Sequence, residues 1–389
     1  MTGQDGKTVH TTHIFYADDL VLAASSPNTL QTMISQLNHY SKTKGWVNTE
    51  KSKILVFNSR KDSPCIYYDG TKLEVVDEFK YLGMIFNRDN KMSHADAQWS
   101  RSFMAASSRI SSKIKDWGVH RRLDLSLRLH NTYALSNGMY ASQIWASTFI
   151  DPLSPSRSKT ESSQLSILRF LSGARKATCS RSLVHELGQM PYRFYWFRSI
   201  VRFWNSLSNS DNPLIKIVLS SDVCLAKDGF PSWSYDVLQT LKNVEDPLLP
   251  LSSNFMNLSP LNLSNTVKVY TNCLNKFWSE MPDHSHIRHT CVNNRKSLTY
   301  NHWFKESSKP QIPVYSKNKN LSFEDVKYIA RFRLGSHYLE VEQGRFSNIS
   351  WHNRICKRCS SNSVDDACHL LECDFFKNER HSQLLPSSF

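Results

Sequence analysis

Near the N-terminus, short apolar runs flank an acidic pair and are followed by apolar residues at helical spacing. Residues 12–24 are expected to form a strand, a tight turn at Asp18-Asp19 and a second strand. Two serines before Pro27 are typical of a helix start. The expected helix carries four apolar residues at helical spacing: Leu30, Met33, Ile34 and Leu37. The pattern predicts a helix packed beneath a small sheet.

The remaining pattern predicts further strands, then mostly helices. Residues 206–265 are rich in Ser, Asn, Leu and Pro, which predicts a loosely packed linker. Asp69-Gly70 favours a tight hairpin turn. Further elements are expected as strands over 53–57 and 66–76, and as helices over 94–117, 123–145 and 267–281. The sequence therefore predicts an α+β fold.

Three motifs follow one another in the N-terminal part. They are Tyr-Ala-Asp-Asp at 16–19, a Gly…Asn…Lys segment at 44–53 that includes Lys51, and Phe-Lys-Tyr-Leu-Gly-Met-Ile-Phe at 79–86. Their order and spacing resemble the late palm subdomain of reverse transcriptases from non-LTR (LINE-type) retrotransposons. Adjacent carboxylates at a hairpin tip can also hold two divalent metals about 3.5–4 Å apart, as nucleotidyl transfer requires.

The resemblance implies an RNA-directed DNA polymerase with an RNA template, a DNA primer or target, and deoxynucleotides as substrates. In such an enzyme Asp18 and Asp19 bind catalytic Mg2+. The turn formed by Tyr81, Leu82 and Gly83 holds the primer, and Lys51 belongs to the primer- and template-binding region. An ordinary β-turn glycine at position 83 is an equally good interpretation of that turn.

The resemblance also implies that part of the site lies upstream of this sequence. In the family a third aspartate comes from an earlier palm strand, whereas residues 1–15 offer only Asp5, in a Gly-rich stretch that does not match. Fingers, the first half of the palm and an N-terminal endonuclease are also expected to be missing. The chain is therefore expected to be an incomplete palm with a helical thumb-like region, inactive by itself. The alternative is a non-catalytic RNA- or DNA-binding protein derived from a retroelement.

Charge favours a nucleic-acid partner. The 48 Lys and Arg residues outnumber 34 Asp and Glu, for a formal charge of +14, and 40% hydrophobic residues exclude a disordered basic tail. Basic and aromatic residues concentrate between 165 and 205, where Arg169, Arg175 and Lys176 are candidates for template contact. Phe194, Phe197, Val201 and Trp204 also fall at helical spacing, which equally predicts a buried stripe with arginines on the wet face.

The C-terminal tail carries a metal-binding pattern. Cys356 and Cys359 are separated by two residues, and His369 and Cys373 follow after nine more. Four such ligands can enclose one tetrahedral Zn2+ as a structural site. Cys368 could replace His369 as third ligand. The tail resembles the family's C-terminal Cys-x2-Cys…His-x3-Cys module, which favours His369.

The sequence also predicts where the protein is located. The first residues lack an apolar signal core and no apolar run has transmembrane length, so an intracellular protein of the nucleus or cytoplasm, without a membrane partner, is expected. The His-rich patch at 284–289 is better explained as an exposed turn than as a metal site.

These observations divide the chain into five segments. The expected segments are a late palm at 1–90, a helical thumb-like region at 91–205, a linker at 206–265, a basic helical region at 266–350 and a zinc-binding tail at 351–389.

Overall fold

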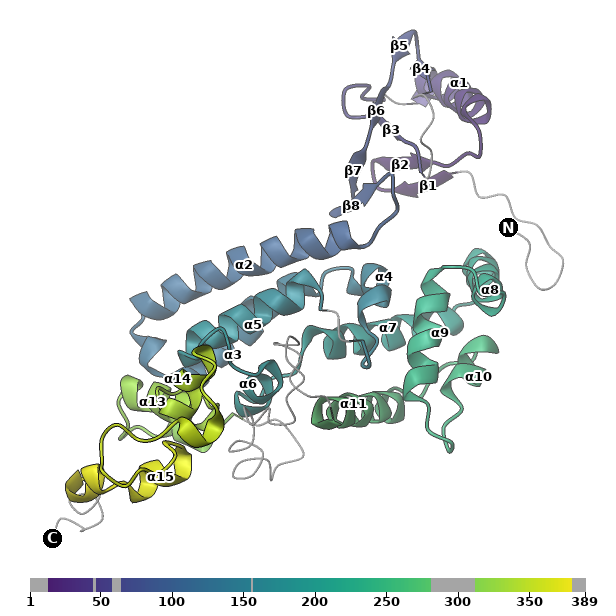
Figure 1. Cartoon of the computed structure of the whole chain (residues 1–389). Helices are drawn as coiled ribbons and strands as arrows, with labels where there is room; N and C mark the ends of the chain where they lie inside the picture. The colour runs from purple at the N-terminus through teal and green to yellow at the C-terminus, as the bar shows by residue number, and fades with distance from the viewer. Residues whose placement is uncertain (1–12, 45–46, 58–63, 155–156, 281–311, 380–389) are drawn as a thin grey trace. The chain divides into compact units, whose positions relative to one another are not determined.

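The computed structural model describes residues 13–44, 47–57, 64–154, 157–280 and 312–379 (Figure 1). The fold is α+β, as the sequence predicts. The chain divides into two compact units, each assembled from separate stretches: residues 1–102, 138–160 and 193–274 form the first, and the remaining stretches form the second. The units therefore do not follow the order of segments along the sequence. Asp5 and the His-rich patch lie outside the described residues.

The first unit contains the described strands, which pair in twos. The hairpin predicted at 12–24 is confirmed, with Tyr16 opposite Asp19 in its antiparallel register. The predicted helix after Pro27 is also confirmed. The elements are β1 (His13–Tyr16), β2 (Asp19–Leu22), α1 (Pro27–Lys44), β3 (Lys53–Leu55), β4 (Tyr67–Tyr68), β5 (Thr71–Lys72), β6 (Glu74–Val76), β7 (Glu78–Tyr81) and β8 (Met84–Asn87).

A small apolar core joins α1 to these strands. Ile34 of α1 packs in it with residues from the strand region: Ile54, Ile66, Tyr68 and Leu73. The hairpin turn at Asp69-Gly70 is confirmed, since both residues have positive φ and β4 pairs with β5. β6 leaves this hairpin and pairs in parallel with β3. The helix-on-sheet arrangement matches the hydrophobic pattern.

The segment 206–265, expected to be a linker, is mostly helical. Asn212 caps the first of its helices by accepting from the Leu214 amide, and Ser232 caps the second by accepting from the Tyr235 amide. Their apolar faces are buried at Val223, Val237 and Leu241, among others. The composition concealed these helices because capping residues and loop residues are the same residue types. The helices are α8 (Pro213–Lys227), α9 (Trp233–Val244) and α10 (Leu251–Met256).

The other helices of the chain carry most of its buried aromatic residues. The predicted helix at 94–117 is confirmed as α2, whereas the stretch 123–145 is interrupted after α3 and resumes only briefly as α4. The elements are α2 (Ser93–Asp116), α3 (Leu123–Tyr133), α4 (Ser142–Trp145), α5 (Lys159–Ser172), α6 (Ser180–Glu186), α7 (Tyr192–Ser208) and α11 (Leu263–Glu280). None of the helices in the described ranges combines the length and apolar character needed to cross a membrane.

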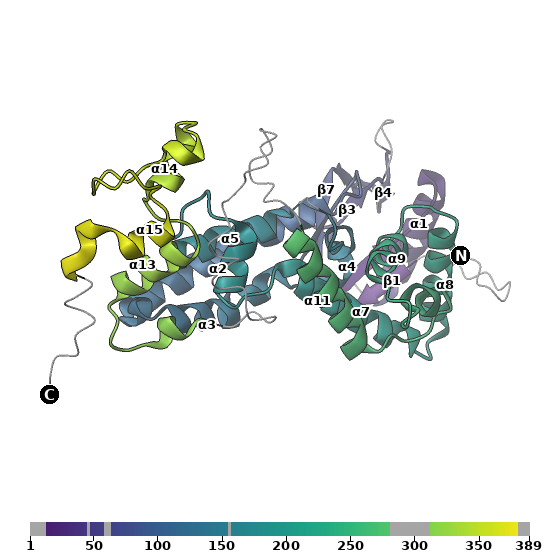
Figure 2. The same ribbon diagram turned by 60° about the horizontal axis from the view of Figure 1, so that its bottom comes forward.

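The second unit packs the C-terminal helices onto α3, α5 and α6. Leu123, Leu168 and Leu183 share one core with Val326 and Leu334. Both views show α13 beside α3 and α5 (Figure 2). The C-terminal elements are α13 (Phe323–Arg333), α14 (Glu340–Phe346) and α15 (Ala367–Glu372).

Candidate functional site

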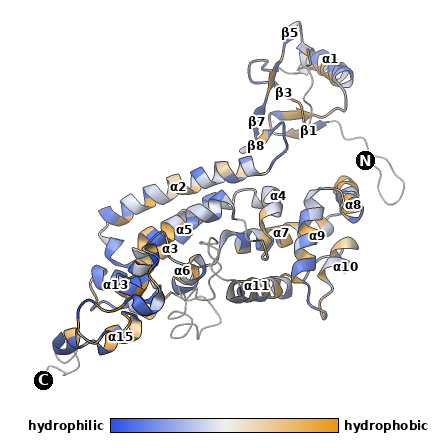
Figure 3. Ribbon diagram, viewed as in Figure 1, coloured by the Kyte–Doolittle hydropathy of each residue, from blue (hydrophilic) through white to orange (hydrophobic). Residues whose placement is uncertain are grey.

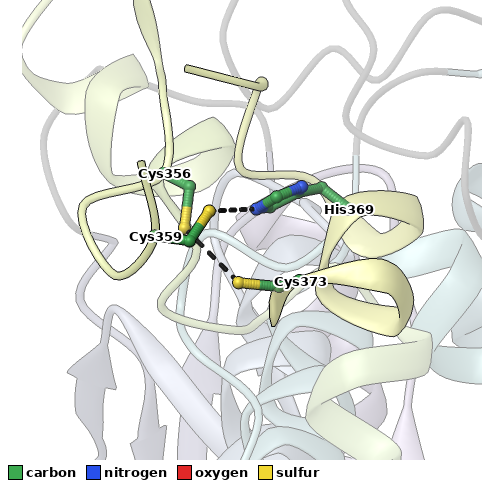
Figure 4. Close-up of side chains that lie close together, drawn as sticks. All are labelled: Cys356, Cys359, His369 and Cys373. Atoms are coloured by element: carbon green, nitrogen blue, oxygen red, sulfur yellow. Dashed lines mark hydrogen bonds between the residues drawn. The ribbon is translucent and has the colours of Figure 1, made fainter. Parts of the chain in front are cut away.

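Four side chains of the C-terminal tail converge on one point (Figure 4). The ligand atoms of Cys356, Cys359, His369 and Cys373 all lie within 4.8 Å of one another. Among the residues that the structure describes, no other group of three or more His, Cys, Asp or Glu residues is placed to share a metal ion. The structure thus brings together the four residues that the sequence spacing singles out.

The distances between these atoms fit a tetrahedral zinc site. Cys356 Sγ and Cys373 Sγ are 4.0 Å apart, and Cys359 Sγ lies 3.4 Å from His369 Nε2. With Zn–S near 2.3 Å and Zn–N near 2.0 Å, the tetrahedron edges would be about 3.8 Å and about 3.5 Å. Cys356 and Cys373 are buried and the other two side chains are half-buried. The cluster could bind zinc as a closed, four-ligand centre.

Local structure holds the two ligand pairs against each other. An isolated bridge between Ile355 and Val364 closes the loop that carries Cys356 and Cys359. Asp366 caps α15 by accepting from the His369 amide at 2.8 Å, which fixes the helix turn that presents His369. The Cys373 amide donates to the His369 carbonyl at 2.7 Å, at the end of that helix.

Arg358 and Asp365 support the cluster from outside. The Arg358 amide donates to Cys356 Sγ at 3.4 Å, and its guanidinium donates to both oxygens of Asp365. Asp365 is 1% exposed and also accepts from the Glu340 amide at 2.8 Å, so it ties the loop to the start of α14. Three thiolates around Zn2+ leave a net charge of −1, which the Arg358 guanidinium can partly offset.

The pKa of the Cys359 thiol is lowered, whereas those of Cys373 and Cys368 are raised. Hydrogen bonds from the hydroxyl and amide of Ser361 lower the pKa of Cys359 to about 6, which favours a thiolate near neutral pH. Burial raises the pKa of Cys373. Cys368 is exposed, its pKa is raised by partial burial and by Asp366 and Glu372, and it is not part of the cluster. The geometry therefore selects His369.

Asp18 and Asp19 lie at the tip of the β1–β2 hairpin. Ala17 has φ 53° in the turn, and both aspartates are exposed. The apolar side chains of β1, which are Ile14, Phe15 and Tyr16, are between 56% and 64% exposed, whereas those of β2 are half-buried. Figure 3 colours the apolar residues of the ribbon orange. In the described residues no third carboxylate joins the pair, and the Mg2+ expectation gains no support. The hairpin has the expected shape, and the side chains of β1 are exposed.

The Tyr81-Leu82-Gly83 segment forms the turn of the β7–β8 hairpin. Leu82 has φ 46° and Gly83 has φ 86°, the left-handed pair that a tight hairpin turn requires. Gln98 of α2 donates to the Gly83 carbonyl at 2.7 Å and accepts from the Ile85 amide at 3.2 Å. The turn is thereby held by side chains of the helical part of its own unit.

The other expected contact residues lie in two turns and one helix. Lys51 is exposed in the turn before β3. Arg169 is half-buried and donates to the Thr178 carbonyl and Ser180 hydroxyl, so it joins α5 to the start of α6. Arg175 is half-buried and Lys176 is exposed in the turn after α5.

The aromatic residues of α7 form a buried stripe. Trp196, Phe197 and Trp204 are 0% exposed, and Phe197 and Trp204 stack on Tyr270 and Phe255 at centroid distances of 3.9 Å. These aromatic side chains are structural, as the helical spacing allowed, while Arg198 and Arg202 of the same helix are exposed.

Part of the chain is similar to a known protein. Over 142 residues the chain is 30% identical to an uncharacterized transposon-derived protein of Caenorhabditis elegans. The match covers 34% of this chain and 48% of that protein, so it spans about half of the relative's length. No protein-family model matches the chain. No solved structure matches it.

Proposed function

We propose that the chain derives from the reverse transcriptase of a non-LTR retrotransposon and that its own function is to bind RNA or single-stranded DNA. The observation that carries this proposal is the pair of hairpins that present Asp18-Asp19 and Leu82-Gly83 at tight turns, in the order that the resemblance requires. The likeness to a transposon-derived protein supports a retroelement origin. A formal charge of +14 supports a polyanionic partner.

Binding is proposed in preference to catalysis because the β1–β2 hairpin supplies only part of the carboxylates that catalysis needs. Two-metal nucleotidyl transfer needs carboxylates that converge from more than one strand. β1 and β2 offer Asp18 and Asp19 from a single turn, and the apolar side chains of β1 are exposed where a palm would have a neighbouring strand. Deoxynucleotide addition would need a third carboxylate from another strand. Two carboxylates from one turn, without that third ligand, would hold Mg2+ weakly.

Zn2+ is proposed as the ion of the C-terminal cluster. Cys356, Cys359, His369 and Cys373 fill all four positions of a tetrahedron, which leaves no open position for a substrate. The ion would join the loop at 356–359 to α15 and stabilise the tail. We also propose that the late palm expected at 1–90 and the zinc-binding tail expected at 351–389 are functional divisions of the chain, whereas the helical stretch 206–265 does not act as a linker.

A direct binding experiment tests the proposed function. Fluorescence anisotropy of a labelled oligouridine, titrated with the full chain at several salt concentrations, should show saturable binding that weakens steeply with salt. The alternative, a non-catalytic RNA- or DNA-binding protein derived from a retroelement, predicts the same result. Absence of binding to RNA and to single-stranded DNA at low salt would contradict both forms of the proposal.

A further inference from the structure

The second unit holds a group of cations and exposed aromatic rings that come from two distant stretches of the chain. Arg175 lies in the turn after α5, and Arg331 lies in the last turn of α13. The Arg175 guanidinium lies over the ring of Tyr338 at 3.7 Å, and Arg331 lies 5.9 Å from the ring of Tyr328. Tyr338 is 62% exposed and Tyr328 is 60% exposed. Cations and open aromatic faces therefore alternate on one small surface.

Neutral groups, rather than carboxylates, hold this group together. Arg331 Nε donates to the Gly173 carbonyl at 2.7 Å, and the Arg175 amide donates to the hydroxyl of the buried Ser336 at 2.8 Å. In the described residues neither guanidinium forms an ion pair with a carboxylate, whereas Lys327 nearby is paired with Glu324 at 3.4 Å. The positive charge of Arg175 and Arg331 is left available to an anion.

Gly173 allows the two stretches to approach closely. Its φ is +67°, and a Cβ at this position would lie 3.1 Å from Arg331 Nη2 and 3.4 Å from Lys327 Cδ. The turn after α5 and the end of α13 are thus packed with little room between them. Both arginines are half-buried, so their side chains lose less freedom on binding than those of exposed, unanchored cations.

Electrostatics at Tyr338 agree with this geometry. A hydrogen bond from Arg175 and the charges of Arg175 and Arg331 lower the pKa of the Tyr338 hydroxyl. Arg175 covers one face of the ring, and the exposure of the side chain leaves ring surface for a second planar group. An unpaired base is such a group, and the positive charge of the guanidinium groups beside it would attract backbone phosphates.

We propose that Arg175, Arg331 and Tyr338 form the centre of a binding site for single-stranded nucleic acid, in which the arginines contact phosphates and Tyr338 stacks on a base. The inference rests on the proposed function and assigns it to one surface. Arg331 and Tyr338 lie outside the basic stretch that the sequence singles out. Lys176, exposed beside Arg175, and Tyr328 extend the same surface.

The test compares RNA binding by the zinc-supplied full chain and four variants, using anisotropy of a labelled oligouridine over a range of salt. Arg175→Gln/Arg331→Gln should weaken binding at least about tenfold and reduce the salt slope by about 1.4, the value for two lost phosphate contacts on a single strand. The matched control is Arg121→Gln/Arg128→Gln, which removes two exposed arginine charges elsewhere in this unit and should weaken binding about twofold or less. Thermal unfolding of each variant checks that it is folded.

The ring is tested separately, with a pair of variants at one position. Tyr338→Ala should weaken binding about fivefold or more with an unchanged salt slope, and Tyr338→Phe should retain binding. If wild type binds and the two double variants weaken binding equally, the site assignment is wrong while the proposed function stands. If wild type binds neither RNA nor single-stranded DNA, the proposed function itself fails. Equal loss of binding to anionic vesicles and to RNA in the double variant, with no effect of Tyr338→Ala, would also overturn the assignment.

Discussion

The hydroxyl of Tyr140 donates a hydrogen bond of 2.8 Å to the backbone carbonyl of Leu82, a residue 58 positions earlier. The ring of Tyr140 also packs against Trp99 of α2, with ring centroids 4.9 Å apart. Together with Gln98, these contacts fix the β7–β8 turn against helical residues of the same unit. A turn that carries a glycine at φ 86° is therefore held in one position by side chains.

Tyr140→Phe should destabilise this unit by about 0.5–1.5 kcal/mol, because it removes one hydrogen bond and retains the ring packing. The measurement is the free energy of unfolding from urea titration. Tyr133→Phe is the control, since Tyr133 is an exposed tyrosine at the end of α3. Equal unfolding free energies for wild type and Tyr140→Phe would show that the hydrogen bond contributes nothing.

Glu186→Gln should be among the most destabilising single substitutions in the second unit. The Glu186 side chain is 3% exposed, pairs with Arg333 and accepts from the Tyr315 hydroxyl at 2.8 Å. Removal of its charge leaves the half-buried Arg333 guanidinium without this carboxylate, at a cost of about 3 kcal/mol, the lower end of the range for breaking a buried pair.

Asp77→Asn is the control for Glu186→Gln. It breaks the Arg88–Asp77 pair, in which the carboxylate side chain is 79% exposed, and should change stability by about 1 kcal/mol or less. Similar unfolding free energies for the two variants would mean that burial does not strengthen the Glu186 pair.

Acid should destabilise the second unit through His130. Burial lowers the pKa of His130 to about 4 from an ordinary value of 6.5. Its contribution is complete above about pH 6.5 and is lost as pH falls toward 4, because the unfolded chain takes up the proton first. The loss reaches about 3 kcal/mol at the lower end, from about 1.4 kcal/mol per pH unit.

The check is urea unfolding at a series of pH values, with a chelator present so that metal loss contributes equally throughout. His130→Gln should show a shallower fall in stability over the same range than wild type. Parallel pH profiles for the two proteins would exclude His130 as the group responsible.

Zinc content should depend on pH and on the four clustered residues. Thiolates are the ligands, so protons compete with the ion for Cys356, Cys359 and Cys373, and the zinc bound per chain should fall as the solution is made acidic. Cys356→Ser and Cys373→Ser should lower the zinc bound per chain, measured by elemental analysis, and loosen the tail. Cys368→Ser should retain full zinc content because Cys368 lies outside the cluster. Equal zinc in all three variants would contradict the site.

Short-range patterns in the sequence predicted much of what the structure contains. The hairpin at Asp18-Asp19, α1 after Pro27 and the spacing of the four tail ligands depend on residues near one another, so local rules sufficed. The helices at 213–256 were missed because Asn212 and Ser232 look like loop residues unless their capping role is known. Cys368 and His369 are adjacent in α15; spacing alone allowed either as third ligand, the resemblance favoured His369, and the structure places only His369 in the cluster.

Contacts between distant stretches could not be read from the sequence. Arg169, which is predicted to contact the template, also donates to the Thr178 carbonyl and the Ser180 hydroxyl, and its position in the sequence does not indicate these contacts. Arg175 meets Ser336 across 161 positions, which no periodicity indicates. The surface proposed for nucleic acid exists only because the second unit brings these stretches together.

The most direct test of the central claim, a reverse-transcriptase-derived chain that binds nucleic acid without polymerising it, is primer extension. A DNA primer annealed to an RNA template is incubated with deoxynucleotides, Mg2+ and either the full chain or its Asp18→Ala/Asp19→Ala variant, and RNA binding is measured in parallel. The account predicts no extension by either protein, with salt-sensitive RNA binding retained by both. Extension by wild type that is lost in the variant would contradict it, because the hairpin would then be part of a complete catalytic site.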